Sequence, residues 1–189
     1  MVSRAVSYMY CALAHPERVS VDMLTDNPFA GRSIFKGFVL PWCAAVAAVT
    51  LVSYCIYAEE FRSEAAVLKP LFAMVSLLSA YIASVLLCMF TSRRFLGKEL
   101  DRTAAETVTA YAFLPVFVLR VVLGVMPNMF FLKALLLYVL YMLWVFAGDT
   151  LKFGERERQI FMLVNGASII LMPWLVQSVL RMLVPNIAM

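Results

Sequence analysis

The chain has 189 residues, of which 63% are hydrophobic and only 15% are charged, and its formal net charge is +4. Soluble globular proteins are roughly half apolar and roughly a quarter charged, so this composition excludes an ordinary soluble domain. The charges gather in short patches between long uncharged runs, and these runs can cross a hydrocarbon core of about 30 Å. We therefore predict an all-α fold, a polytopic bundle of transmembrane helices.

Residues 1–32 are predicted to form a cytoplasmic segment in front of the membrane domain. Four apolar residues in this segment recur at helical spacing: Val2, Val6, Met9 and Leu13. This pattern is typical of an amphipathic helix that lies in the membrane interface. Pro16 is expected to end that helix.

Residues 33–189 contain five apolar runs, which we predict as transmembrane helices over 33–57, 67–90, 106–126, 129–147 and 160–184. The third run is preceded by the pattern T-A-A-E, in which Thr103 and Glu106 are expected to form a capping box. Pro115 and Pro173 are predicted to interrupt the third and fifth helices, because proline removes a backbone donor and clashes with the preceding turn.

The distribution of Lys and Arg predicts the orientation of these helices. Eleven of the 16 Lys and Arg residues lie before or at the start of the first span, between the second and third, and between the fourth and fifth. Four lie near connections on the opposite side, and Arg120 lies within the third span. Because cytoplasmic connections carry the basic excess, the N-terminus should be cytoplasmic and the C-terminus outside, in a bacterial cytoplasmic (inner) membrane. The same bias explains the positive charge without nucleic acid as a partner.

Patterns typical of catalysis are missing from the sequence. The only histidine is His15, and there is no HExxH, GxSxG or P-loop pattern. The four cysteines show no metal-ligand spacing. We therefore expect no enzyme, no catalytic residue, no bound metal and no cofactor.

Arg120 stands out because a charge within the hydrocarbon costs at least about 2.5 kcal/mol at mid-span. Lys133 and Arg181 lie near the same, outer ends of the fourth and fifth spans. We predict an intramembrane polar cluster, in which these cations clamp their helices to the acidic residues of the first outer loop, Glu59, Glu60 and Glu64. An anion or lipid-headgroup site is the alternative interpretation.

Uncharged polar residues inside the second and fifth spans are expected to hydrogen-bond neighbouring helices: Ser76, Ser79, Ser84, Asn165 and Gln177. The two prolines offer a different interpretation, because helix breaks can line a cavity. A small transporter or channel subunit for an anionic or amphipathic solute, with Arg120 attracting the anion, therefore stays open as an alternative function.

The connection between the second and third spans holds four basic residues: Arg93, Arg94, Lys98 and Arg102. The next cytoplasmic connection, residues 148–159, alternates charges of opposite sign. Together they are predicted to form a face that attracts anionic membrane lipid, at about 1 kcal/mol per near-surface cation. Docking of another membrane or cytoplasmic protein is the equal alternative, and a homo-oligomer is left open.

Three stretches of the chain resemble the Yip-one domain family of Ypt/Rab-interacting membrane proteins: HPERVSVDMLTDNPFAGRSIFKGFVLPW, RRFLGKELDR and AYAFLP. Tyr111, Leu114 and Pro115 match the family motif G-Y-x-x-L-P, with Ala110 in place of glycine. The D-L-x-G-P motif and the long cytoplasmic region of eukaryotic members are not matched, which favours the compact prokaryotic type. The resemblance implies five spans, a cytoplasmic N-terminus and a non-enzymatic adaptor or membrane organiser that binds other proteins.

Overall fold

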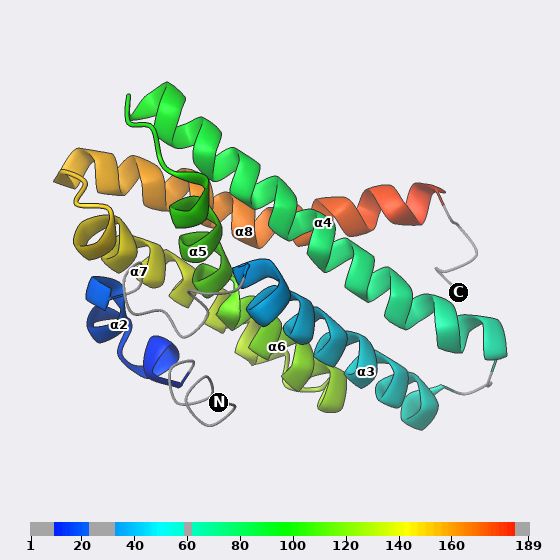
Figure 1. The fold of residues 1–189 in the computed structure, drawn as a ribbon. Helices are drawn as coiled ribbons and strands as arrows, with labels where there is room; N and C mark the ends of the chain where they lie inside the picture. Colours follow the sequence, from blue (N-terminus) through cyan, green and yellow to red (C-terminus); the bar gives the residue numbers. More distant parts are fainter. Residues whose placement is uncertain (1–9, 23–32, 59–61, 184–189) are drawn as a thin grey trace.

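The computed structural model describes residues 10–22, 33–58 and 62–183, and every regular element in this part of the chain is helical (Figure 1). The elements follow one another as α2 (Pro16–Asp22), η1 (Phe35–Val39), α3 (Leu40–Tyr57), α4 (Ser63–Phe95), α5 (Arg102–Ala112), α6 (Leu114–Val125), η2 (Phe130–Leu135), α7 (Leu136–Val145), η3 (Phe146–Thr150) and α8 (Glu155–Leu183). The predicted all-α fold is confirmed.

Five of the described helical stretches are long and apolar enough to cross a membrane: Phe35–Tyr57, Ser63–Phe95, Arg102–Val125, Phe131–Thr150 and Glu155–Leu180. They coincide with the five predicted spans and differ from them mainly at their ends. Ser63–Phe95, for example, extends beyond the predicted 67–90 at both ends. Apolar content locates only the part of a helix inside the hydrocarbon, whereas backbone hydrogen bonding continues into the polar interface.

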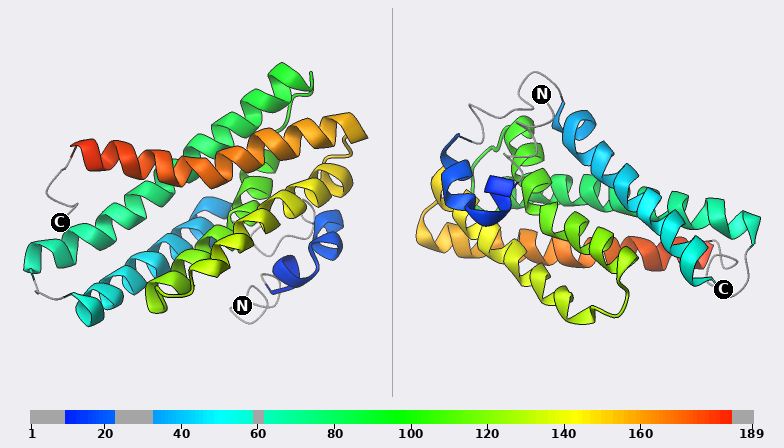
Figure 2. Two further views of the ribbon diagram at one scale, coloured as in Figure 1. Left: turned by 180° about the vertical axis from the view of Figure 1, so that it is seen from behind. Right: turned by 90° about the horizontal axis from the view of Figure 1, so that it is seen from below.

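The five helices pack into a bundle in which α4 lies against both α3 and α8 (Figures 1 and 2). The α4–α5 and η3–α8 connections lie at one end, which we call the basic end after Arg93, Arg94, Lys98 and Arg102. The ends of α3 and α6 lie together at the other end, which we call the far end. There the Tyr57 hydroxyl donates to the carbonyl oxygen of Val125 at 3.0 Å.

The third span is the most buried of the five and is interrupted at its centre. Helix α5 ends at Ala112 and α6 begins at Leu114, with Phe113 between them and Pro115 in the first turn of α6. All four of these residues are buried. The interruption predicted at Pro115 is confirmed, whereas the one predicted at Pro173 is wrong, because α8 runs unbroken through that residue.

The predicted capping box is wrong. Helix α5 already begins at Arg102, so Thr103 lies inside its first turn, and no side chain caps the helix at Asp101. Glu106 instead accepts a hydrogen bond from Nε of Arg102 at 2.8 Å. The two residues are four positions apart on one helix face, where an ion pair competes directly with the capping geometry.

Residues 10–22 pack against α7 and η3. Most of the predicted interfacial helix lies outside the described residues, although residues 10–14 are helical. Pro16 ends that stretch and opens α2, a position that proline favours. The hydroxyl of Tyr138 donates to the carbonyl oxygen of Leu13 at 2.5 Å, and that of Tyr141 donates to Oε1 of Glu17 at 2.8 Å.

Candidate functional sites

Arg93 and Arg94 lie in the last turn of α4 and are both exposed. Neither residue forms a salt bridge with another residue in the described part of the chain. Phe95 follows them with 60% of its surface exposed, and its ring meets that of Phe90 edge-on at 6.5 Å. The end of α4 therefore presents two arginines beside an exposed aromatic pair.

Lys98 joins the two connections at the basic end. Its Nζ lies 2.7 Å from Oε2 of Glu157 and 4.9 Å from the centre of the Phe153 ring. The backbone N–H of Gly154 also donates to Oε2 of Glu157, at 2.9 Å. The predicted union of residues 91–102 and 148–159 in one face is thus present, but within it Lys98 is held by its own chain.

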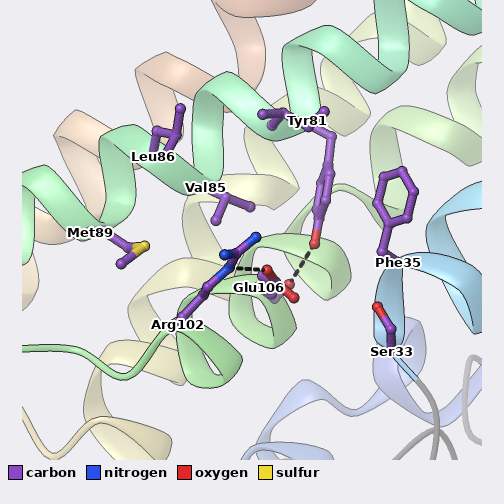
Figure 3. A pocket seen from close by; sticks show the side chains of 9 residues that line it. Ser33, Phe35, Tyr81, Val85, Leu86, Met89, Arg102 and Glu106 are labelled. Carbon is purple, nitrogen blue, oxygen red and sulfur yellow. Dashed lines mark hydrogen bonds and ion pairs between the residues drawn. The ribbon is translucent and has the colours of Figure 1, made fainter.

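Arg102 and Glu106 flank a pocket of about 450 Å³ between α4, α5 and the start of η1 (Figure 3). Tyr81 closes one side, and its hydroxyl donates to the carbonyl oxygen of Glu106 at 3.1 Å. The remaining lining is largely apolar, with Phe35, Ile82, Val85, Leu86 and Met89. The pocket can hold an apolar group with a polar atom at the Arg102–Glu106 pair.

A second cavity, of about 490 Å³, lies near the far end among α3, α4, α6, η2, α7 and α8. Arg120, Lys133 and Gln177 line it together. With the Gln177 amide oxygen facing the guanidinium, it accepts from Nη2 and Nη1 of Arg120 at 3.0 and 3.2 Å. This contact links α6 to α8 inside the span, as predicted for Gln177.

The predicted cluster of cations and carboxylates is only partly visible. Glu59 and Glu60 lie outside the described residues, as does the side chain of Arg181. Glu64 is exposed in the first turn of α4 and does not line the cavity. The structure brings Arg120 and Lys133 to one cavity, and the complete clamp stays a prediction.

Some of the remaining polar side chains in the spans hydrogen-bond a neighbouring helix, and others hydrogen-bond their own helix. Ser168 donates to Ser84 at 3.1 Å and so links α8 to α4, as expected for Ser84. Ser76 and Asn165 instead donate to carbonyl oxygens of their own helices, and Ser79 is exposed. The Ser76 hydroxyl and the Nδ2 group of Asn165 both reach carbonyl oxygens of the preceding helical turn, whereas Oδ1 of Asn165 has no partner among the described residues.

Tyr111, Leu114 and Pro115, the residues that carry the family resemblance, are buried around the break in the third span. The rings of Tyr111 and Phe38 lie 5.1 Å apart. These positions pack η1 and the interrupted helix together. Their arrangement fits a packing role at the centre of the bundle.

Sequence reasoning missed three residues of the far-end cavity. Thr50 and Ser53 are three positions apart on α3 and so share the helix face that lines it. Trp174 lines it from α8, directly after Pro173. The spacing of Thr50 and Ser53 was a usable signal, but nothing in the sequence said which neighbouring helices they would face.

No protein-family model matches the chain, and neither a curated protein nor a solved structure matches it. Within the described residues there is also no group of three or more His, Cys, Asp or Glu side chains that could hold a metal ion. The resemblance to the Yip-one domain family therefore stays a prediction. The fold and the composition together identify the chain as a polytopic integral membrane protein with five candidate spans.

Proposed function

We propose that this protein is a non-enzymatic adaptor or membrane organiser of the compact Yip-one type, which docks a partner protein at its basic end. The observation that carries the proposal is the exposed run Arg93-Arg94-Phe95 at the end of α4. Arginine and aromatic side chains dominate binding energy at protein interfaces. Arginine also binds carboxylates and phosphates with two parallel hydrogen bonds, which gives direction as well as attraction.

Contacts directly after this run fix the backbone at the end of α4, and an ordered backbone favours a docking surface. Gly97 follows the helix at φ 63°, a left-handed conformation that glycine adopts without steric cost. The next N–H, that of Lys98, then turns back to the carbonyl oxygen of Ser92 at 3.1 Å. The Lys98–Glu157 salt bridge adds a second anchor. Prior ordering of a surface lowers the entropy lost when a partner binds.

The charge distribution supports a cytoplasmic position for the basic end, in a bacterial inner membrane. In that position the partner is a cytoplasmic protein or the cytoplasmic part of another membrane protein. Anionic lipid headgroups would strengthen the same contact, because they attract exposed cations near the surface.

Photocrosslinking in cells tests this proposal. A photoreactive residue replaces Phe95, whose side chain is exposed, and the captured proteins are identified by mass spectrometry. We expect one reproducible protein adduct, which is lost in the variant Arg93→Glu/Arg94→Glu. The control variant Lys152→Glu/Arg156→Glu makes the same charge change in exposed residues of the neighbouring connection and should keep the adduct. Capture of lipid alone, or equal loss in both variants, would reject specific docking at this run.

The transport alternative is favoured by one observation, the cavity that reaches Arg120 and Gln177. Transport requires that water enter this cavity from outside the cell. In a Cys55→Ser background, which removes an exposed thiol, a cysteine at position 177 should then react with a membrane-impermeant thiol reagent. Protection of that cysteine in folded protein, with normal labelling after denaturation, would count against transport.

A further inference from the structure

The far-end cavity is lined by both cationic and apolar residues. Seventeen described residues line it, and five of them are polar: Thr50, Ser53, Arg120, Lys133 and Gln177. The cavity therefore brings two cations and an apolar lining together within a membrane-spanning bundle.

The charges lie at a depth that suits a lipid headgroup. Arg120 is five residues from the end of α6 at Val125, which corresponds to about 7.5 Å along the helix axis. Lys133 lies in η2, close to the start of the next span. The amide oxygen of Gln177, on α8, accepts from two N–H groups of the Arg120 guanidinium and so orients it. Both cations thus lie within about two helical turns of the end of a candidate span.

The cavity also reaches the outer surface of the bundle. Trp174 lines it and is 64% exposed, and Lys133 lines it and is exposed as well. A lining residue that is also exposed on a transmembrane helix marks an opening toward lipid. Apolar residues such as Ile170 and Pro173 also line the cavity.

We propose that this cavity binds an anionic amphiphile from the bilayer, with its phosphate or carboxylate group at Arg120 and Lys133 and its apolar chain along Trp174. Charge-assisted hydrogen bonds from the two cations would hold the head. The apolar wall would shield the first part of the chain. The volume of about 490 Å³ lies within the usual range of small-molecule sites. This site is separate from the docking run, which lies at the opposite end of α4.

The test titrates purified protein in a neutral detergent with dioctanoyl phosphatidic acid and follows the melting temperature and tryptophan fluorescence. Dioctanoylglycerol keeps the chains without the anion, and inorganic phosphate keeps the anion without the chains. We expect saturable stabilisation by the phosphatidic acid and at least tenfold weaker effects of the other two. If inorganic phosphate stabilises the protein as strongly as phosphatidic acid, the cavity binds a free anion, and the proposal of an amphiphile is overturned. If dioctanoylglycerol does so, the anionic group is not recognised, and the proposal is overturned as well.

Variants assign the binding to the cavity. Arg120→Gln/Lys133→Gln should weaken phosphatidic acid binding about tenfold or more, the loss expected for a charge-assisted bond. Lys133→Gln alone should weaken phosphatidic acid binding several-fold. Because Lys133 is exposed, this single variant replaces the double variant if the latter does not fold. Arg18→Gln removes one exposed cation that lies in neither proposed binding surface and should leave the affinity unchanged. Unchanged affinity in Lys133→Gln, or equal loss in Arg18→Gln, would overturn the proposal.

Discussion

Nζ of Lys98 and Oε2 of Glu157 lie 2.7 Å apart, although the two residues are separated by 59 positions and two membrane spans. Their contact ties the α4–α5 connection to the start of α8. Both side chains are more than a quarter exposed, at 45% and 33%, so water and salt weaken the pair.

Reversal of one charge should therefore lower the melting temperature modestly, and reversal of both should restore it in part, because a lysine at position 157 cannot accept the Gly154 N–H. We expect Lys98→Glu to place two carboxylates together, and Lys98→Glu/Glu157→Lys to recreate the pair. Melting curves in detergent at low and high salt measure this, and the difference between variants should shrink at high salt. A double variant as unstable as the single one would show that the pair does not join the connections.

Gly124→Ala should destabilise the bundle by about 1–3 kcal/mol, as overpacking does elsewhere. A Cβ at this position would lie 2.5 Å from Cγ1 of Val49 on α3. Valine has one strongly preferred rotamer in a helix, so its methyl group cannot rotate away cheaply. Gly166→Ala is the matched comparison, because there the nearest atom is the mobile end of Leu140. Thermal unfolding should rank Gly124→Ala below Gly166→Ala, and the reverse order would contradict this packing.

Arg120→Leu should lower the melting temperature in detergent. The substitution removes the cation that faces Gln177 and leaves the amide oxygen of Gln177 without that donor. Gln177 is half-buried, so the lost bond should cost about 0.5–1.5 kcal/mol, the usual net contribution of a hydrogen bond. Arg93→Leu makes the same chemical change at an exposed position and should leave the melting temperature nearly unchanged. Equal melting temperatures for both variants and the parent would speak against a structural role of Arg120.

Asn165→Leu should stabilise the bundle by about 1 kcal/mol. Asn165 is 2% exposed, and its Oδ1 has no hydrogen-bond partner among the described residues. Replacement of an unsatisfied buried polar group by an apolar one of similar size is neutral or favourable. Ser168→Ala, one turn away, should have the opposite sign, because it removes the bond to Ser84. A lower stability of Asn165→Leu would indicate that the Asn165 oxygen is satisfied.

Tyr138→Phe should release the N-terminal segment without unfolding the bundle. The Tyr138 hydroxyl donates to the carbonyl oxygen of Leu13, a bond that contributes about 0.5–1.5 kcal/mol. Hydrogen exchange should therefore quicken in residues 10–22 while the spans stay protected. Tyr57→Phe removes a comparable hydroxyl-to-carbonyl bond at the far end and should not affect this segment. Equal exchange in all three proteins would refute the docking role of Tyr138.

The sequence by itself determined the five spans and the break near Pro115. Bilayer thickness sets the length of an apolar run, and proline removes a donor wherever it stands, so both signals are local. It did not determine that α8 continues through Pro173, nor that Glu106 pairs with Arg102 instead of capping α5. Those outcomes depend on competing partners around each residue.

Only the tertiary structure decided which distant residues meet. The Lys98–Glu157 pair, the contact of Arg120 with Gln177 and the cavity lined by Thr50 and Trp174 each join residues from different helices. In a membrane all helices are apolar on most faces, so a hydrophobic pattern does not reveal which face turns toward which neighbour. Close packing and side-chain hydrogen bonds set the rotation of each helix, and these form only when the helices come together.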